Sequence, residues 1–145
     1  MSTSCGKLIE SLNQLVTVYR HLLEVVRKEQ DVLLETRLED LSEVNKSKEK
    51  MVLKIKQLES QWTEGAKSLG LQLGIESSRP SLKDLAKYVG EADSKKLMNL
   101  HSVLSLLVHR IVELNKKNEK LTQSALSHIN GAMQSIAHTL SLIHI

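Results

Sequence analysis

The histidines and the single cysteine are the residues of this chain best suited to metal or acid–base chemistry. His101 and His109 are eight residues apart, and His128 and His138 are ten apart. No Glu precedes a His by three residues, so the paired ligands of di-iron helical bundles are missing. Cys5 lies in a short polar leader without a neighbouring His to activate its thiol. Because a P-loop and a GxGxxG motif are also missing, we expect no enzyme activity, catalytic residue, cofactor or metal.

A lysine-rich run is the sequence feature that could contact nucleic acid. Lys46, Lys50 and Lys54 fall on one helical face, which could meet phosphates. Glu43 and Glu49 stand among these lysines, and no aromatic residue interleaves with them. The whole chain has a formal net charge of only +3, with both signs alternating along it. We interpret the run as a solvated helix face and expect no binding of nucleic acid.

The composition indicates how the core is built. Of the 145 residues, 41% are hydrophobic, yet only 2% are aromatic and one is Pro. A core of Leu, Ile, Val, Ala and Met is typical of bundles of long helices. The start, MSTSCGK, has no apolar signal region, and no stretch approaches twenty continuous apolar residues. With one cysteine and no anchor, we expect a cytoplasmic protein without membrane insertion.

Apolar residues recur in steps of three and four, which predicts helices over about 7–35, 37–69, 82–89 and 94–139. The last of these has the strongest periodicity in the chain. Thr36 followed by Glu39 indicates a capping box at the start of the second helix. Ser81 should cap the short third helix, and Asp93 or Ser94 the last one.

These elements predict an all-α fold, an elongated bundle of three long antiparallel helices with one short connecting helix. The bundle consists of a helical hairpin and a long C-terminal helix. We expect residues 1–6 to form a disordered leader and residues 7–139 a single helical domain. The final residues 140–145, LSLIHI, resemble the translation of an adapter used in preparing sequencing libraries, and we interpret them as an adapter scar.

Polar residues interrupt the apolar seam of each long helix. The breaks fall at Glu29 and Gln30 in the first helix, at Lys48 in the second and at Asn118 in the last. Lys48 could extend its amine out of the bundle, or it could set the register of packing as a buried polar group. Asn115 and Asn118 raise a similar question on the last helix. There a register-setting contact is favoured over a ligand site.

The end of the last helix has an unusual composition. No Asp, Glu, Lys or Arg occurs after Lys120, although 26% of the chain is charged. The apolar seam of the last helix becomes weak beyond Leu121. A more apolar stripe begins there, displaced from the seam by one residue, which is about 100° of helix rotation. The stripe comprises Leu126, Ile129, Met133 and Ile136. It could pack on the short third helix or on a second copy of the chain, or it could capture a different protein.

Two segments resemble the FlgN family of flagellar export chaperones. The first is LLEVVRKEQDVLLETRLEDLSEVNKSKEKMVLKIKQLE, in which the Lys-Glu pair of that family would be Lys48 and Glu49. The second is HRIVELNKKNEKLTQSALSHI, in which an Asn at position 118 precedes a Leu at position 121 and an apolar tail follows. The resemblance extends from Leu8 to about Ile136. At the hairpin turn, where the family usually has Gly or Asp, this sequence has Thr36.

The resemblance implies a cytoplasmic chaperone that binds the C-terminal helical regions of hook–filament junction proteins. Such a chaperone would deliver them to the flagellar type III export apparatus. We expect the partner-binding residues to be Asn118, Leu121, Ala125, Leu126, Ile129, Met133 and Ile136. The alternative is a structural coiled-coil protein that self-assembles through the same tail, for example as a homodimer.

Overall fold

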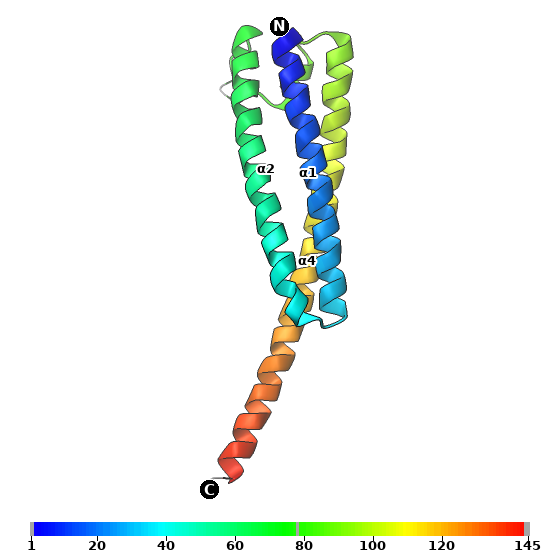
Figure 1. Cartoon of the computed structure of the whole chain (residues 1–145). Helices are drawn as coiled ribbons and strands as arrows, with labels where there is room; N and C mark the ends of the chain where they lie inside the picture. The colour runs from blue at the N-terminus through cyan, green and yellow to red at the C-terminus, as the bar shows by residue number, and fades with distance from the viewer. Residues whose placement is uncertain (1, 78, 144–145) are drawn as a thin grey trace.

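The computed structural model describes the backbone of residues 2–77 and 79–143 and the side chains of residues 4–77 and 79–124. These residues form four helices: α1 (Ser2–Leu34), α2 (Leu38–Gln72), α3 (Leu82–Ala86) and α4 (Glu91–Ile143). Consecutive long helices are antiparallel, so α1 and α4 run in the same direction (Figure 1). The predicted all-α bundle of three long helices and one short connecting helix is confirmed.

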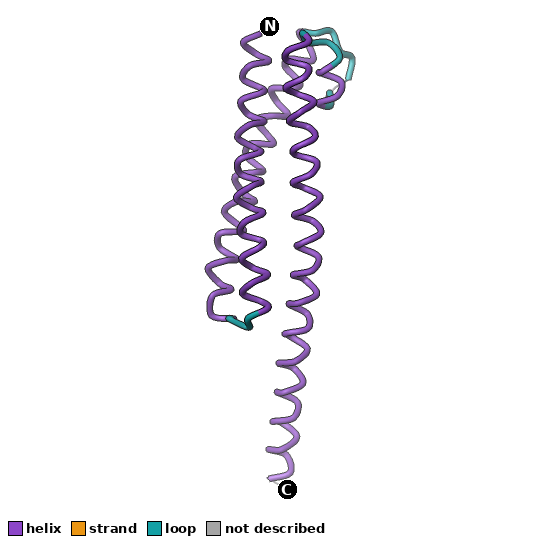
Figure 2. Tube along the Cα trace, turned by 90° about the vertical axis from the view of Figure 1, so that its right-hand side faces the viewer, coloured by secondary structure: helices purple, strands orange, loops and turns teal. Residues whose placement is uncertain are grey.

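Helix α1 is the shared packing partner of the two other long helices. It packs along both α2 and α4, whereas no Cα atom of α2 lies within 8 Å of one in α4 among the described residues. The short α3 packs on α4 and touches α2, closing one end of the layer (Figure 2). We call this end of the bundle the α3 end. The opposite end, which holds the α1–α2 turn, is called the turn end. Because α2 and α4 pack on α1 and not along each other, one side of α1 faces the space between them.

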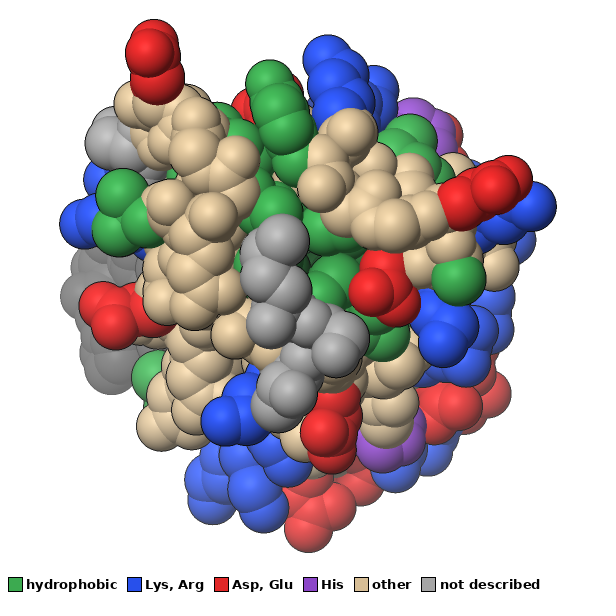
Figure 3. All heavy atoms as spheres, turned by 90° about the horizontal axis from the view of Figure 1, so that it is seen from above, with side chains coloured by type: hydrophobic (Ala, Val, Ile, Leu, Met, Phe, Trp, Pro, Cys, Tyr) green, Lys and Arg blue, Asp and Glu red, His purple; other side chains and the backbone are tan. Residues whose placement is uncertain are grey.

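The core follows the seam of α1. Leu12 is 1% exposed and Val26 is 0% exposed, because steps of three and four place these positions on one helical face. Leu69 of α2, Leu85 of α3 and Leu97 of α4 are equally buried and belong to the same cluster. Viewed from the α3 end, apolar side chains show between the helices, and charged side chains surround them (Figure 3).

The expected disordered leader is wrong for residues 2–6, which are the first residues of α1. Cys5 is 2% exposed and belongs to the core cluster, because it lies three residues before Leu8 on the same face. Burial, together with the nearby Asp93 carboxylate, raises the pKa of the Cys5 thiol. This cysteine is therefore a packing residue that stays protonated at neutral pH.

The predicted capping box at Thr36 is also wrong, because Thr36 ends α1 instead of starting α2. Its φ is +55°, in the left-handed region. The Thr36 N–H donates to the Leu33 carbonyl at 3.3 Å, and the Arg37 N–H donates to the Val32 carbonyl at 3.0 Å. This pair of bonds is a Schellman motif, which satisfies the last carbonyls of α1. Helix α2 begins after Arg37 without a side-chain cap.

The loop at the α3 end uses residues suited to its geometry. Gly74 ends α2 with a φ of +75°, and the Ile75 N–H donates to the Gly70 carbonyl at 2.9 Å. A Cβ atom at Gly70 would lie 2.9 Å from the Cγ of Pro80, so any larger residue would force the proline ring or the backbone to shift. Ser81 caps α3 in a capping box with Asp84, as predicted, and these bonds lower the pKa of the Asp84 carboxyl.

The last helix begins earlier and ends later than predicted. Helix α4 starts at Glu91, so Asp93 and Ser94 lie within its first turn instead of capping it. The Ser94 N–H donates to the Gly90 carbonyl at 2.8 Å, which closes that turn. Helix α3 is shorter than predicted, ending at Ala86. Of the suspected adapter residues 140–145, the backbone of 140–143 continues α4, while 144–145 lie outside the described residues.

Candidate partner-binding surface

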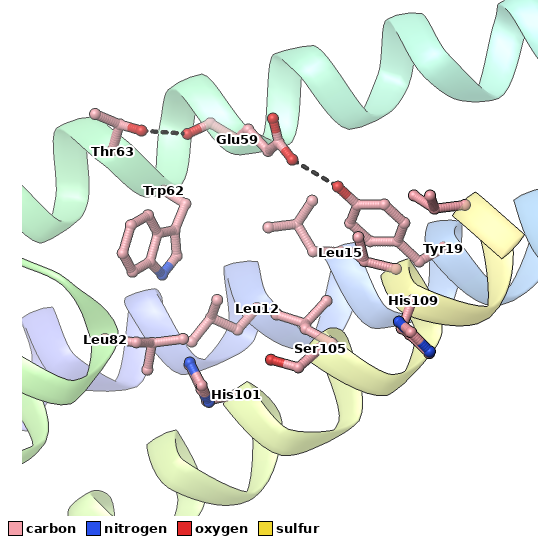
Figure 4. Close-up of a pocket in the computed structure, with 13 residues that line it drawn as sticks. Leu12, Leu15, Tyr19, Glu59, Trp62, Thr63, Leu82, His101, Ser105 and His109 are labelled. Atoms are coloured by element: carbon pink, nitrogen blue, oxygen red, sulfur yellow. Dashed lines mark hydrogen bonds between the residues drawn. The ribbon is translucent and has the colours of Figure 1, made fainter.

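A groove of about 740 Å³ lies over α1 between α2 and α4 (Figure 4). Leu12 and Leu15 of α1 line it from below, and Leu82 of α3 lies at one end. The α2 wall includes Trp62, and the α4 wall includes Val108 and Val112, together with Leu104 and Ser105. The groove exists because α1 keeps α2 and α4 apart. Its shape and apolar lining suit the apolar face of a helix.

The groove carries little charge at neutral pH. Glu59 is its only acidic or basic lining residue besides two histidines, and it accepts a 2.6 Å hydrogen bond from the Tyr19 hydroxyl. Burial and this carboxylate raise the pKa of Tyr19, so the phenol stays protonated. The Trp62 Nε1–H is shielded from solvent and has no hydrogen-bond partner among the described residues. The groove therefore favours an occupant whose buried face is uncharged.

Two of the four histidines named in the sequence analysis, His101 and His109, line this groove. His101 and His109 lie on its α4 wall, and His109 Nε2 is 3.2 Å from the Glu113 carboxylate. Within the described part of the chain, no three His, Cys, Asp or Glu side chains gather in a way that could hold a metal ion. The histidines are polar residues in the α4 wall of the groove.

Helix α4 exposes much of its apolar surface. Val108 and Val112 are 38% and 46% exposed on the groove wall, and Leu106 is 61% exposed and does not line the groove. The segment Glu91–Ser124 is long and apolar enough to cross a membrane by length and composition, a test that core helices of soluble proteins also pass. Only 11% of its most apolar window is buried, so packing on α1 leaves apolar surface uncovered.

The three interrupted seams meet in one polar layer near the turn end. Lys48 Nζ lies 3.1 Å and 3.3 Å from the two Glu29 carboxylate oxygens, and it donates to Asn115 Oδ1 at 2.5 Å. Asn118 Nδ2 donates to Glu29 Oε1 at 2.8 Å and to the Val26 carbonyl at 2.9 Å. The layer ties α1 to both neighbours. Lys48 therefore makes specific polar contacts with α1 and α4 instead of extending its amine out of the bundle.

Asn118, one of the predicted partner-binding residues, lies in the polar layer. Its side chain is buried, with 2% of the residue exposed, and it is bonded to α1. The Nδ2 group is committed to these bonds, so we assign Asn118 to the polar layer, where only its Oδ1 is left for another donor. Leu121 is half-buried near the same end. Ala125, Leu126, Ile129, Met133 and Ile136 belong to the backbone of α4, and their side chains lie outside the described residues.

The predicted tail stripe is in phase with the groove side of α4. Val112 lines the groove, and steps of three and four residues lead from it to Leu126. The intermediate positions are Asn115, Glu119 and Thr122, which line a small pocket in the polar layer. Beyond the α1–α2 turn, α4 continues past the bundle (Figures 1 and 2). We call these positions the α4 strip: Val108, Val112, Asn115, Glu119, Thr122, Leu126, Ile129, Met133 and Ile136.

Sequence reasoning identified the tail but missed the groove. The periodicity of each helix indicates one buried seam. It does not indicate which helices pair, so it could not show that α2 and α4 do not pack along each other. Val108 and Val112 lie outside the seam of α4, and this second apolar face was the available signal. Tyr19 and Trp62 are two of the three aromatic residues, and both line the groove.

Comparison with known proteins identifies the family. The FlgN protein family matches residues 1–141, nearly the whole chain. The uncharacterized protein YvyG of Bacillus subtilis (strain 168) is 26% identical over 127 residues, which cover 88% of this chain and 77% of that protein. No solved structure gives a significant match. With its three long helices and its uncovered α4, this chain belongs to the FlgN family of flagellar export chaperones.

Proposed function

We propose that this protein is a cytoplasmic chaperone that binds the C-terminal helical regions of hook–filament junction proteins through the α4 strip. The observation that carries the proposal is the course of α4, which continues past the α1–α2 turn without a neighbouring helix (Figure 1). Its sequence there has an apolar stripe and no charged residue after Lys120. A partner helix lying along the strip would cover this surface and keep the partner from assembling too early.

The energetics favour reversible binding. Burying the four stripe side chains from Leu126 to Ile136 would contribute about 6 to 12 kcal/mol in gross terms, at about 1.5 to 3 kcal/mol each. Ordering the partner segment and immobilising side chains offsets much of this gain. Moderate affinity follows, which suits a chaperone that must release its cargo at the export apparatus.

The proposal is tested by placing a charge at three positions of α4. The ligand is the C-terminal helical segment of a hook–filament junction protein from the same bacterium, titrated by calorimetry. Ile129→Asp tests the tail, and Val112→Asp tests the groove wall. Leu106→Asp is the matched control, because Leu106 is 61% exposed and does not line the groove. We expect at least a tenfold loss of affinity for the first two variants and less than a twofold change for the control.

Unchanged affinity in Ile129→Asp would remove the tail from the binding site. Equal losses of affinity in all three variants would show that an added charge weakens binding wherever it is placed on α4, and that the α4 strip is not the binding site. Multi-angle light scattering on the free protein tests the alternative, self-assembly through the tail. A stable assembly that Ile129→Asp dissociates, with no binding of the junction protein, would favour a structural coiled-coil protein over a chaperone.

A further inference from the structure

A small pocket interrupts the apolar course of the α4 strip. It has a volume of about 250 Å³ and lies between the groove and the tail, where α4 passes the polar layer. Its lining residues come from all three long helices: Glu29, Lys48, Asn115, Asn118, Glu119, Thr122 and Gln123. A partner helix that followed the strip would pass over this pocket. The side chain it presented there would face polar groups instead of aliphatic ones.

The hydrogen bonds of the layer leave acceptors in excess. Lys48 Nζ donates to Glu29 and to Asn115 Oδ1. Asn118 Nδ2 donates to Glu29 and to the Val26 carbonyl. Among the described residues, Asn118 Oδ1 has no hydrogen-bond partner, although it is shielded from solvent. The side chain of Asn118 is thus nine-tenths or more buried and has one unmatched acceptor. A buried acceptor without a donor is unfavourable, so a group that supplies a donor is favoured here.

The charges lining the pocket also favour a donor. Glu29 and Lys48 form an ion pair at 3.1 Å, so their charges offset each other. Glu119 is the remaining charged lining residue, and its Oε1 has only a long 3.4 Å contact with Asn115 Nδ2. The lining residues therefore carry one net negative charge and unmatched acceptors. Arg and Lys side chains carry donors only and one positive charge, which matches both features.

We infer that this pocket receives a basic side chain, Arg or Lys, of the partner helix. The inference rests on the proposed function, because it specifies what the bound helix carries between two apolar stretches. The α4 strip then consists of an apolar stretch at the groove, a cation-binding position at Glu119 with the buried Asn118 beside it, and a second apolar stretch in the tail. Apolar contacts alone would let a helix slide by one turn, whereas a seated cation fixes the register.

The pocket can be tested without knowing the partner. Ethylguanidinium is titrated into the ¹⁵N-labelled full-length protein, and the side-chain amide resonances of Asn115 and Asn118 are followed by NMR. We expect saturable shifts of these amides and no such shifts with tetramethylammonium, which has the charge but no donors. Lack of a saturable shift, or equal shifts with both cations, would overturn the inference.

A second measurement concerns the bound helix. Glu119→Lys reverses the unpaired charge of the pocket, and Glu113→Lys is the matched control on an exposed position of the same helix. With the junction-protein segment as ligand, we expect at least a tenfold loss of affinity for Glu119→Lys and less than twofold for Glu113→Lys. Equal effects would overturn the inference. If the wild-type protein did not bind that segment, the proposed function would fail, and the ethylguanidinium titration would still decide the pocket.

Discussion

At the α3 end of the molecule the helices meet through Leu12, Leu85 and Leu97, whereas at the turn end they meet through Glu29, Lys48 and Asn118. Aliphatic packing is strong and has little directional preference, so it stabilises the α3 end without specifying one register. The polar layer contributes less free energy, but its bonds require particular atoms to be opposite each other. The uncovered part of α4 leaves the bundle next to the layer that specifies register.

The largest expected effect comes from the α3 end. Leu97→Ala removes a side chain that is 0% exposed, and the cavity should lower the free energy of unfolding by about 2 to 5 kcal/mol. Urea denaturation followed by circular dichroism measures the change. Leu106→Ala, at an exposed position of the same helix, should stay within about 0.5 kcal/mol. Equal losses for the two variants would contradict the contrast between buried and exposed faces of α4.

A smaller loss is expected at the polar layer. Lys48→Met leaves the Glu29 carboxylate, whose side chain is 9% exposed, without its cation. Since the Lys48 side chain is 28% exposed and solvent screens the pair, we expect a loss of about 1 to 3 kcal/mol. Adding Glu29→Gln should recover part of this loss, because Gln is neutral and can still accept from Asn118. If the double variant were less stable than Lys48→Met, the ion pair would not be the source of the loss.

The smallest effect concerns the two turns that end α1 and α2. Thr36 and Gly74 both have positive φ angles, but only Gly74 adopts this conformation without a steric penalty. Thr36→Gly should therefore raise the free energy of unfolding by about 1 kcal/mol, and Gly74→Ala should lower it by a similar amount. Thermal denaturation of both variants checks the signs. A destabilised Thr36→Gly would mean that the threonine side chain makes a compensating contact.

Several features of this fold could be predicted from the sequence, because they depend on one helix at a time. The periodicity of α1 and α4 predicts two long amphipathic helices. A polar contact within the bundle was the favoured prediction at Asn118 and one of two alternatives at Lys48. The placement of Cys5 could also have been predicted, since positions 5, 8 and 12 continue the seam of α1 in steps of three and four. Its polar neighbours favoured a leader instead.

Other features depend on how the helices pair, which periodicity does not specify. It indicates the buried face of α2 but not that α1 separates α2 from α4, so neither the groove nor the meeting of the three polar breaks was predicted. At Thr36 the local Thr-x-x-Glu pattern matched a capping box. The last carbonyls of α1 needed donors, and the Schellman bonds to Val32 and Leu33 were formed instead.

The length of α4 has a consequence for how the molecule moves through solution. Its 53 residues form a rod of about 80 Å, whereas a compact chain of 145 residues, with a radius of gyration of about 15 Å, is only about 40 Å across. Such a rod experiences more friction than a sphere of 16.3 kDa. A monomer will therefore elute early from a gel-filtration column and imitate a dimer of globular shape.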